Sequence, residues 1–166
     1  MLVTLLSAAL LASETASPIS PKKVERLIET YGAKGAVDKL ANAAPDNNRS
    51  DFGDYGKVLD GIASGADRWL ALVPKLEPGT DAGTAEALRI AVAEALPKNP
   101  SGVLNLVTRK PSWRLACSYP MIEPTSKDTR AYFRVVLPAV RAVRSPALRR
   151  ARNICLTELS KARHSS

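Results

Sequence analysis

Apolar residues recur at a spacing of 34 positions in the first part of this chain. A shift of 34 residues aligns Val24, Val58 and Val92, and it places residues 69–73 over residues 103–107. A period of this length is typical of proteins built from stacked pairs of helices, in which each pair covers the apolar face of the next. We therefore predict a repeat-like helical array over residues 20–107.

Helix-capping residues divide the chain between these apolar stretches. Ala, Leu, Arg and Lys are abundant while aromatic residues make up 5% of the sequence, a balance that favours helices. Most of the predicted helices begin at a residue whose side chain can accept a hydrogen bond from the first turn. The candidate caps are Ser20, Ser50, Asp67, Thr80 or Asp81, Asn99, Thr125 or Ser126, and Ser145.

The C-terminal part, residues 108–163, departs from the repeat. Its first stretch, residues 110–124, contains three prolines and is expected to be a loop or crossover. Two helices follow, the first with Pro138 inside it, and residues 161–166 are expected to fray. The predicted fold is all-α, a single domain over residues 18–163 that stacks about eight helices as helical hairpins.

An apolar run at the N-terminus predicts export. Residues 2–12 are interrupted only by Thr4 and Ser7, and small residues follow before Pro18. This pattern indicates that residues 1–17 are a secretory signal peptide, since the apolar run is too short to span a bilayer. The mature chain is then expected in the periplasm. The alternative is a buried or frayed N-terminal helix.

Two cysteines, Cys117 and Cys155, accord with an oxidising compartment. An even number of cysteines in a small exported protein usually indicates a disulfide. We expect this bond to join the loop after Trp113 to the last helix. The alternative is a pair of buried thiols in a cytosolic protein.

The residues needed for most catalytic sites are missing from the sequence. The single histidine, His164, lies in the tail that is expected to fray. A Ser–His or Cys–His pair requires an ordered imidazole within hydrogen-bonding distance, and zinc sites require clustered His and Cys. The sequence shows no phosphate-binding glycine loop and no nucleophile elbow. We predict that the protein is not an enzyme and holds no metal or cofactor.

Paired carboxylates are the remaining catalytic possibility. Asp51 with Asp54, or Glu77 with Asp81, could lie on adjacent turns, and a glycosidase needs two such groups beside a cleft. Acidic residues at the start of a helix also complement its dipole and cap its first turn. We favour this structural interpretation.

Three sets of residues are candidates for binding a partner. The first comprises Asp51, Asp54 and Tyr55, and the second comprises Glu77 and Asp81 in the turn between two helices. The third is a basic set on the last two helices, Arg134, Arg141, Arg144, Arg149, Arg150 and Arg152. Each set also has a purely structural interpretation. The acidic residues of the first set can be helix caps, the second set can be an ordinary turn, and the basic residues of the third can form a solvated helix face. Export excludes nucleic acid as a partner of the basic set and leaves an acidic protein face, lipid headgroups or an anionic polymer.

Two segments resemble a group of uncharacterised exported proteobacterial proteins. They are the P-G-T-D-A turn at residues 78–82 and the A-L-x-x-N-P-x-x-V-L segment at residues 95–104. This group is similar in character to periplasmic immunity proteins, which neutralise antibacterial effectors delivered by secretion systems. The resemblance implies an inhibitor without catalytic residues, and it assigns no site residues.

The predicted function is a periplasmic protein-binding protein, in its most specific form an immunity protein against an effector encoded by a neighbouring gene. The alternative is a cell-envelope scaffold or assembly factor that uses the same helical surface. A hydrolase with paired carboxylates is a third hypothesis, which Asp-to-Asn replacement of Asp51, Asp54 and Asp81 would test.

Overall fold

The computed structural model describes residues 18–43, 52–120 and 125–164. These residues form helices and turns and no strand, which confirms the all-α prediction. The α-helices are α1 (Pro21–Ala41), α2 (Gly53–Ala63), α3 (Asp67–Leu70), α4 (Val73–Leu76), α5 (Ala82–Ala95), α6 (Pro100–Arg109), α7 (Ser126–Ala142) and α8 (Arg149–His164). Three 3₁₀ segments accompany them, η1 (Glu77–Gly79), η2 (Pro111–Ala116) and η3 (Pro146–Leu148). The predicted signal peptide, Ser50 and Asp51 lie outside the described residues.

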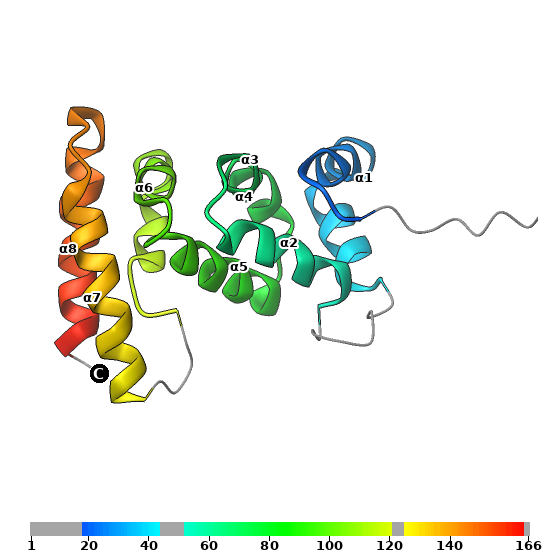
Figure 1. Ribbon diagram of the computed structural model, residues 1–166. Helices are drawn as coiled ribbons and strands as arrows, with labels where there is room; N and C mark the ends of the chain where they lie inside the picture. Colours follow the sequence, from blue (N-terminus) through cyan, green and yellow to red (C-terminus); the bar gives the residue numbers. More distant parts are fainter. Residues whose placement is uncertain (1–17, 44–51, 121–124, 165–166) are drawn as a thin grey trace, which may run out of the picture.

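The helices stack as an array, with α1 at one end and the α7–α8 hairpin at the other (Figure 1). Helix α2 packs on α5, and α3 contacts α6, so corresponding helices of the two repeat units lie against each other. Helix α1 bends at Gly32, where φ is +70°. Gly32 precedes by 34 positions the turn that separates α2 from α3, so the bend divides α1 as that turn divides the next unit. The stacked helical hairpins predicted from the spacing are thus present.

Hydrogen bonds join the turns of the two repeat units. The Asn99 amide donates to the Gly65 carbonyl, 34 residues earlier, at 2.8 Å, and to the Asp67 carboxylate at 2.7 Å. The Lys98 ammonium donates to the Ala63 carbonyl at 2.6 Å, which satisfies a group at the end of α2. Asn99 also caps α6, since its side-chain oxygen accepts from the Gly102 N–H at 2.9 Å. One side chain therefore starts a helix and fixes its distance from the preceding unit.

Replacement of Asn99 by alanine is expected to lower the free energy of unfolding by about 2 kcal/mol, because it removes an N-cap and leaves a buried glycine carbonyl unpaired. Asn105 offers a matched control, since it is exposed on the same helix. Asn105→Ala should change stability by less than about 0.5 kcal/mol. Urea denaturation of the two variants measures the difference. Equal urea midpoints for the two variants would show that the hydrogen bonds between the turns contribute nothing to stability.

Most of the predicted caps are confirmed. Ser20 accepts from the Lys23 N–H, Thr125 accepts from the Asp128 N–H, and Asp81 forms a reciprocal capping box with Thr84. The prediction for Asp67 is wrong, because Asp67 is the first residue of α3 and the cap position is held by Ala66. Its carboxylate accepts the bond from Asn99 instead. Local sequence cannot distinguish a cap from an acceptor that serves the neighbouring unit.

One hydrophobic core runs through the whole array. Buried apolar side chains from Val24 in α1 to Leu159 in α8 form a contiguous cluster. The prediction that the chain frays from residue 161 is wrong, since α8 continues through His164. Within the part of the chain that the structure describes, none of the helices has both the length and the apolar character needed to cross a membrane.

Candidate functional site

The last two helices form an antiparallel hairpin whose inner face is apolar. Helix α7 buries Phe133, Val136, Leu137 and Val140, while α8 buries Ala151, Cys155 and Leu159. In the short connection, the Arg152 guanidinium donates to the Val143 carbonyl at 2.8 Å. The inner face of α8 packs on α6. The outer faces of both helices are left for charged residues.

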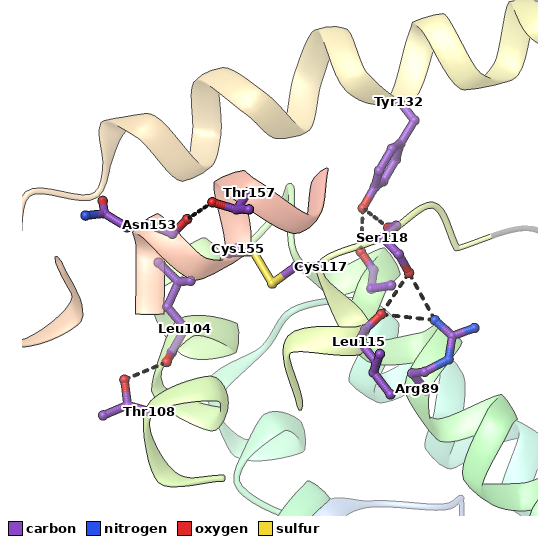
Figure 2. The surroundings of a disulfide bond; sticks show 11 residues. Arg89, Leu104, Thr108, Leu115, Cys117, Ser118, Tyr132, Asn153, Cys155 and Thr157 are labelled. Atoms are coloured by element: carbon purple, nitrogen blue, oxygen red, sulfur yellow. Dashed lines mark hydrogen bonds between the residues drawn. A yellow bond between two sulfur atoms is a disulfide. The ribbon is translucent and has the colours of Figure 1, made fainter. Parts of the chain in front are cut away.

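A disulfide and a tyrosine attach the hairpin to the array (Figure 2). Cys117, at the end of η2, is bonded to Cys155 of α8, which confirms the predicted pair. The Tyr132 hydroxyl of α7 lies 3.2 Å from the Ala93 carbonyl of α5 and 3.1 Å from the Ser118 carbonyl. Arg89 of α5 reaches the same segment through the Leu115 carbonyl and the Ser118 hydroxyl. These contacts fix both helices of the hairpin relative to α5.

The net charge of the protein is concentrated on this hairpin. Residues 125–164 contain ten Lys and Arg and two Asp and Glu, a net charge of +8, which equals the formal net charge of the whole chain. Of the two acidic residues, Glu158 pairs with Lys161 at 3.1 Å, and the Asp128 carboxylate accepts from the hydroxyl of the capping residue Thr125. Neither one neutralises an arginine. The remainder of the chain has as many basic as acidic residues, so the field of the molecule is one-sided.

Seven arginines of the hairpin are exposed, and none of them forms an ion pair with another described residue. Four of them lie where the two helices join, and we call them the turn-end cluster: Arg141, Arg144, Arg149 and Arg150. All four belong to the basic set predicted from the sequence, and they lie in the last turn of α7, the connection and the first turn of α8. An arginine without a partner is available for a carboxylate or phosphate of another molecule.

The other three arginines line a depression at the opposite end of the hairpin, which we call the open-end pocket. It has a volume of about 470 Å³ and is lined by Ser126, Thr129, Arg130, Phe133, Arg134 and Arg163. Arg163 and Arg130 were not identified from the sequence. Arg130 and Arg134 are four residues apart, a spacing that places both on one face of a helix. This spacing is the one feature of the sequence that indicates a shared basic surface.

The acidic candidates are engaged in contacts within the protein. Asp54 pairs with Lys57 at 3.0 Å in the first turn of α2. Glu77 accepts from Lys110 at 2.7 Å and from the indole N–H of the buried Trp113 at 3.2 Å, which ties η1 to η2. Hydrogen bonds from the Thr84 hydroxyl and N–H lower the pKa of Asp81. A general acid requires a raised pKa, so the pKa of Asp81 is shifted in the wrong direction for that role.

Tyr55, proposed from the sequence as a contact residue, is 0% exposed. Burial raises the pKa of its hydroxyl, so the phenol stays protonated. It is therefore a core residue of α2 with no surface to offer a partner. An aromatic beside two aspartates suggested a binding surface, but the apolar stripe of α2 that includes Val58 and Ile62 determines where Tyr55 points.

The Tyr55 hydroxyl has no hydrogen-bond partner among the described residues. Because an unpaired buried hydroxyl is unfavourable, Tyr55→Phe should leave stability unchanged or raise it by up to about 1 kcal/mol. Tyr132→Phe is the matched control, since it removes a hydroxyl that is hydrogen-bonded and should lower stability by about 1 kcal/mol. Thermal denaturation of both variants tests the contrast. A larger loss from Tyr55→Phe than from Tyr132→Phe would contradict it.

His164 is the last residue of α8 rather than part of a frayed tail. Its Nδ1 atom lies 2.6 Å from the Ser160 carbonyl, and the side chain is exposed. With Arg141, Leu156 and Ser160 it borders a shallow depression on the outer side of the hairpin. Over residues 18–43, 52–120 and 125–164, no group of three or more His, Cys, Asp and Glu is placed to hold a metal ion.

Comparisons with protein-family models, with curated proteins and with solved structures found no match to this chain. The charge of the α7–α8 hairpin is therefore the main indication of function.

Proposed function

We propose that this protein acts in the periplasm as a non-catalytic binding protein that engages an acidic protein surface through its α7–α8 hairpin. In its most specific form it is an immunity protein, which neutralises a secreted antibacterial effector encoded by a neighbouring gene. The observation that carries the proposal is the concentration of the net charge of +8 on residues 125–164.

The abundance of arginine favours a surface that binds a protein over a surface that only contacts water. Its planar guanidinium forms bidentate bonds with carboxylates, and arginine is enriched in protein interfaces whereas lysine is depleted. Eight of the ten basic residues of the hairpin are arginine. The turn-end cluster lies at the end of the hairpin farthest from the open-end pocket, with Arg144 and Arg149 on either side of η3, which packs on α6. A rigid, exposed basic surface of this kind can contact an acidic surface of an enzyme.

Charge of one sign also accelerates the encounter with an oppositely charged partner, by tenfold to a thousandfold at low ionic strength. Rapid capture matters for an inhibitor that must reach its target before the target acts. The disulfide and the Tyr132 contacts hold the hairpin in a fixed orientation, so little conformational freedom would be lost on binding.

The proposal is tested with the mature protein and the product of the adjacent gene. Affinity capture should recover the two proteins as a complex, and co-expression should protect cells from the toxicity of that product. If neither complex formation nor protection is observed, the immunity assignment is wrong.

The second candidate is a cell-envelope scaffold or assembly factor. A scaffold must contact two partners at once, and the molecule offers a second surface beyond the hairpin. A small groove between α5 and η2 is bordered by Leu88, Trp113 and Leu115, and Leu115 is 55% exposed although it is apolar. Neighbouring genes for envelope assembly, and capture of two envelope proteins simultaneously, would favour the scaffold.

A further inference from the structure

We propose that the open-end pocket binds a phosphate monoester. The pocket lies between the first turns of α7 and the last turn of α8, whereas the turn-end cluster lies where these helices join (Figure 1). The inference therefore does not depend on the protein partner proposed above, and the two sites can be altered separately.

Three guanidinium groups line this one depression. Arg130 and Arg134 are one turn apart on α7, and Arg163 approaches from α8. No acidic side chain is among its described lining residues. The two acidic residues of the hairpin have partners of their own, Glu158 with Lys161 and Asp128 with Thr125. Like charges gathered around one cavity repel each other, and a bound anion would remove that repulsion. The arrangement is thus complementary to a concentrated negative charge.

A phosphate monoester matches this charge better than a single carboxylate does. It carries a charge of about −1.5 to −2 at neutral pH and has three strong acceptor oxygens, whereas one carboxylate can be satisfied by one bidentate arginine. The Ser126 hydroxyl at the rim is a further donor. The Thr129 hydroxyl donates to the Thr125 carbonyl at 3.1 Å, so its proton is already used within α7.

The size and the apolar wall of the pocket indicate that the ligand is larger than a bare phosphate ion. A volume of about 470 Å³ falls in the range of roughly 300–1,000 Å³ that small-molecule sites occupy. Phe133 supplies an apolar surface between the arginines and the core. The expected ligand therefore has a phosphate monoester joined to a small organic group, either as a soluble metabolite or as the headgroup of a lipid such as phosphatidic acid.

Calorimetric titration of the full mature protein with glycerol 3-phosphate tests the proposal. The variant Arg134→Gln/Arg163→Gln should bind at least about tenfold more weakly than the wild type, because it loses two charge-assisted contacts. The control Arg144→Gln/Arg149→Gln removes the same charge at the other end of the hairpin and should retain affinity within about twofold. All four arginines are exposed, so both variants are expected to fold.

Sedimentation with vesicles that contain phosphatidic acid in phosphatidylcholine separates the two sources of the ligand. Vesicle binding that is lost only in the pocket variant, without binding of glycerol 3-phosphate, identifies a lipid headgroup. Saturable binding of glycerol 3-phosphate that is lost only in that variant identifies a soluble ligand. The proposal is overturned if neither probe binds saturably, or if the pocket variant and the control weaken binding equally.

Discussion

Removing the disulfide by the double replacement Cys117→Ala/Cys155→Ala is expected to lower the free energy of unfolding by about 4 kcal/mol. The bond closes a loop with a sequence separation of 38 residues, and it restricts the unfolded chain by that amount on the loop-entropy model. Both cysteines are fully buried, so alanine also leaves a small void, which adds to the loss. The bond is a direct covalent link between α8 and the segment after η2, in addition to the backbone.

Thermal denaturation with and without a reducing agent measures this contribution. The wild-type protein should melt at a lower temperature under reducing conditions, whereas the double variant should melt at the same temperature in both. Once the bond is removed, the amides of the hairpin should lose hydrogen-exchange protection before those of α2 and α5 do, because the attachment of the hairpin depends on this bond. A wild-type protein that is equally stable with and without reductant would contradict the stabilising role of the bond.

The second large effect is expected at Gly79 in η1. A Cβ atom at this position would lie 2.2 Å from the Ala33 carbonyl carbon and 2.4 Å from the Lys34 nitrogen of α1. These atoms belong to the backbone and cannot move aside as a flexible side chain would. Gly79→Ala is therefore expected to separate η1 from α1 and to lower the free energy of unfolding by about 3 kcal/mol.

Gly83→Ala provides the control for this substitution. A Cβ atom at Gly83 would meet only the Asp81 carboxylate, at 3.8 Å, and the position is exposed in the first turn of α5. Alanine there should leave stability unchanged or raise it by up to about 1 kcal/mol, since glycine is the poorer helix former. Urea denaturation of both variants gives the comparison. If Gly79→Ala is as stable as Gly83→Ala, the close approach of η1 to α1 does not constrain the fold.

The close fit at Gly79 shows why the turn at residues 77–81 was ambiguous in the sequence. The same residues that could form an exposed recognition loop instead cap α5, bind Trp113 and pack on α1. Each of these contacts except the cap joins residues that are more than 30 positions apart. A local motif indicates a turn, but it does not say which face of that turn is covered.

The repeat was readable because a stacked pair of helices imposes its period directly on the sequence. The hydrogen bond between Asn99 and Gly65 joins residues that are 34 positions apart, the same spacing as in the apolar pattern. The disulfide was predictable for a different reason, since two cysteines allow one intramolecular pairing.

The open-end pocket could not be predicted in the same way. Arg130 and Arg163 are 33 positions apart, and they share a cavity because α7 and α8 are antiparallel and of similar length. The sequence alone does not show that these two residues lie close together in space. Tyr55 illustrates the opposite error, because a residue that is polar at its tip and adjacent to Asp54 was assigned to the surface although its ring completes the core.

The charge on the hairpin is the feature on which the functional account depends. The variant Arg144→Glu/Arg149→Glu reverses two charges of the turn-end cluster. The variant Lys22→Glu/Arg26→Glu makes the same change in net charge on two exposed residues of α1, at the other end of the array (Figure 1). Both variants should fold, since all four side chains are exposed.

The most direct measurement is the affinity of these two variants and the wild type for the product of the neighbouring gene, determined in parallel at low and physiological salt. We expect the hairpin variant to bind at least about a hundredfold more weakly and the α1 variant to bind within about threefold of the wild type. Equal affinities for all three proteins, or an equal loss in both variants, would contradict the assignment of the hairpin as the binding surface.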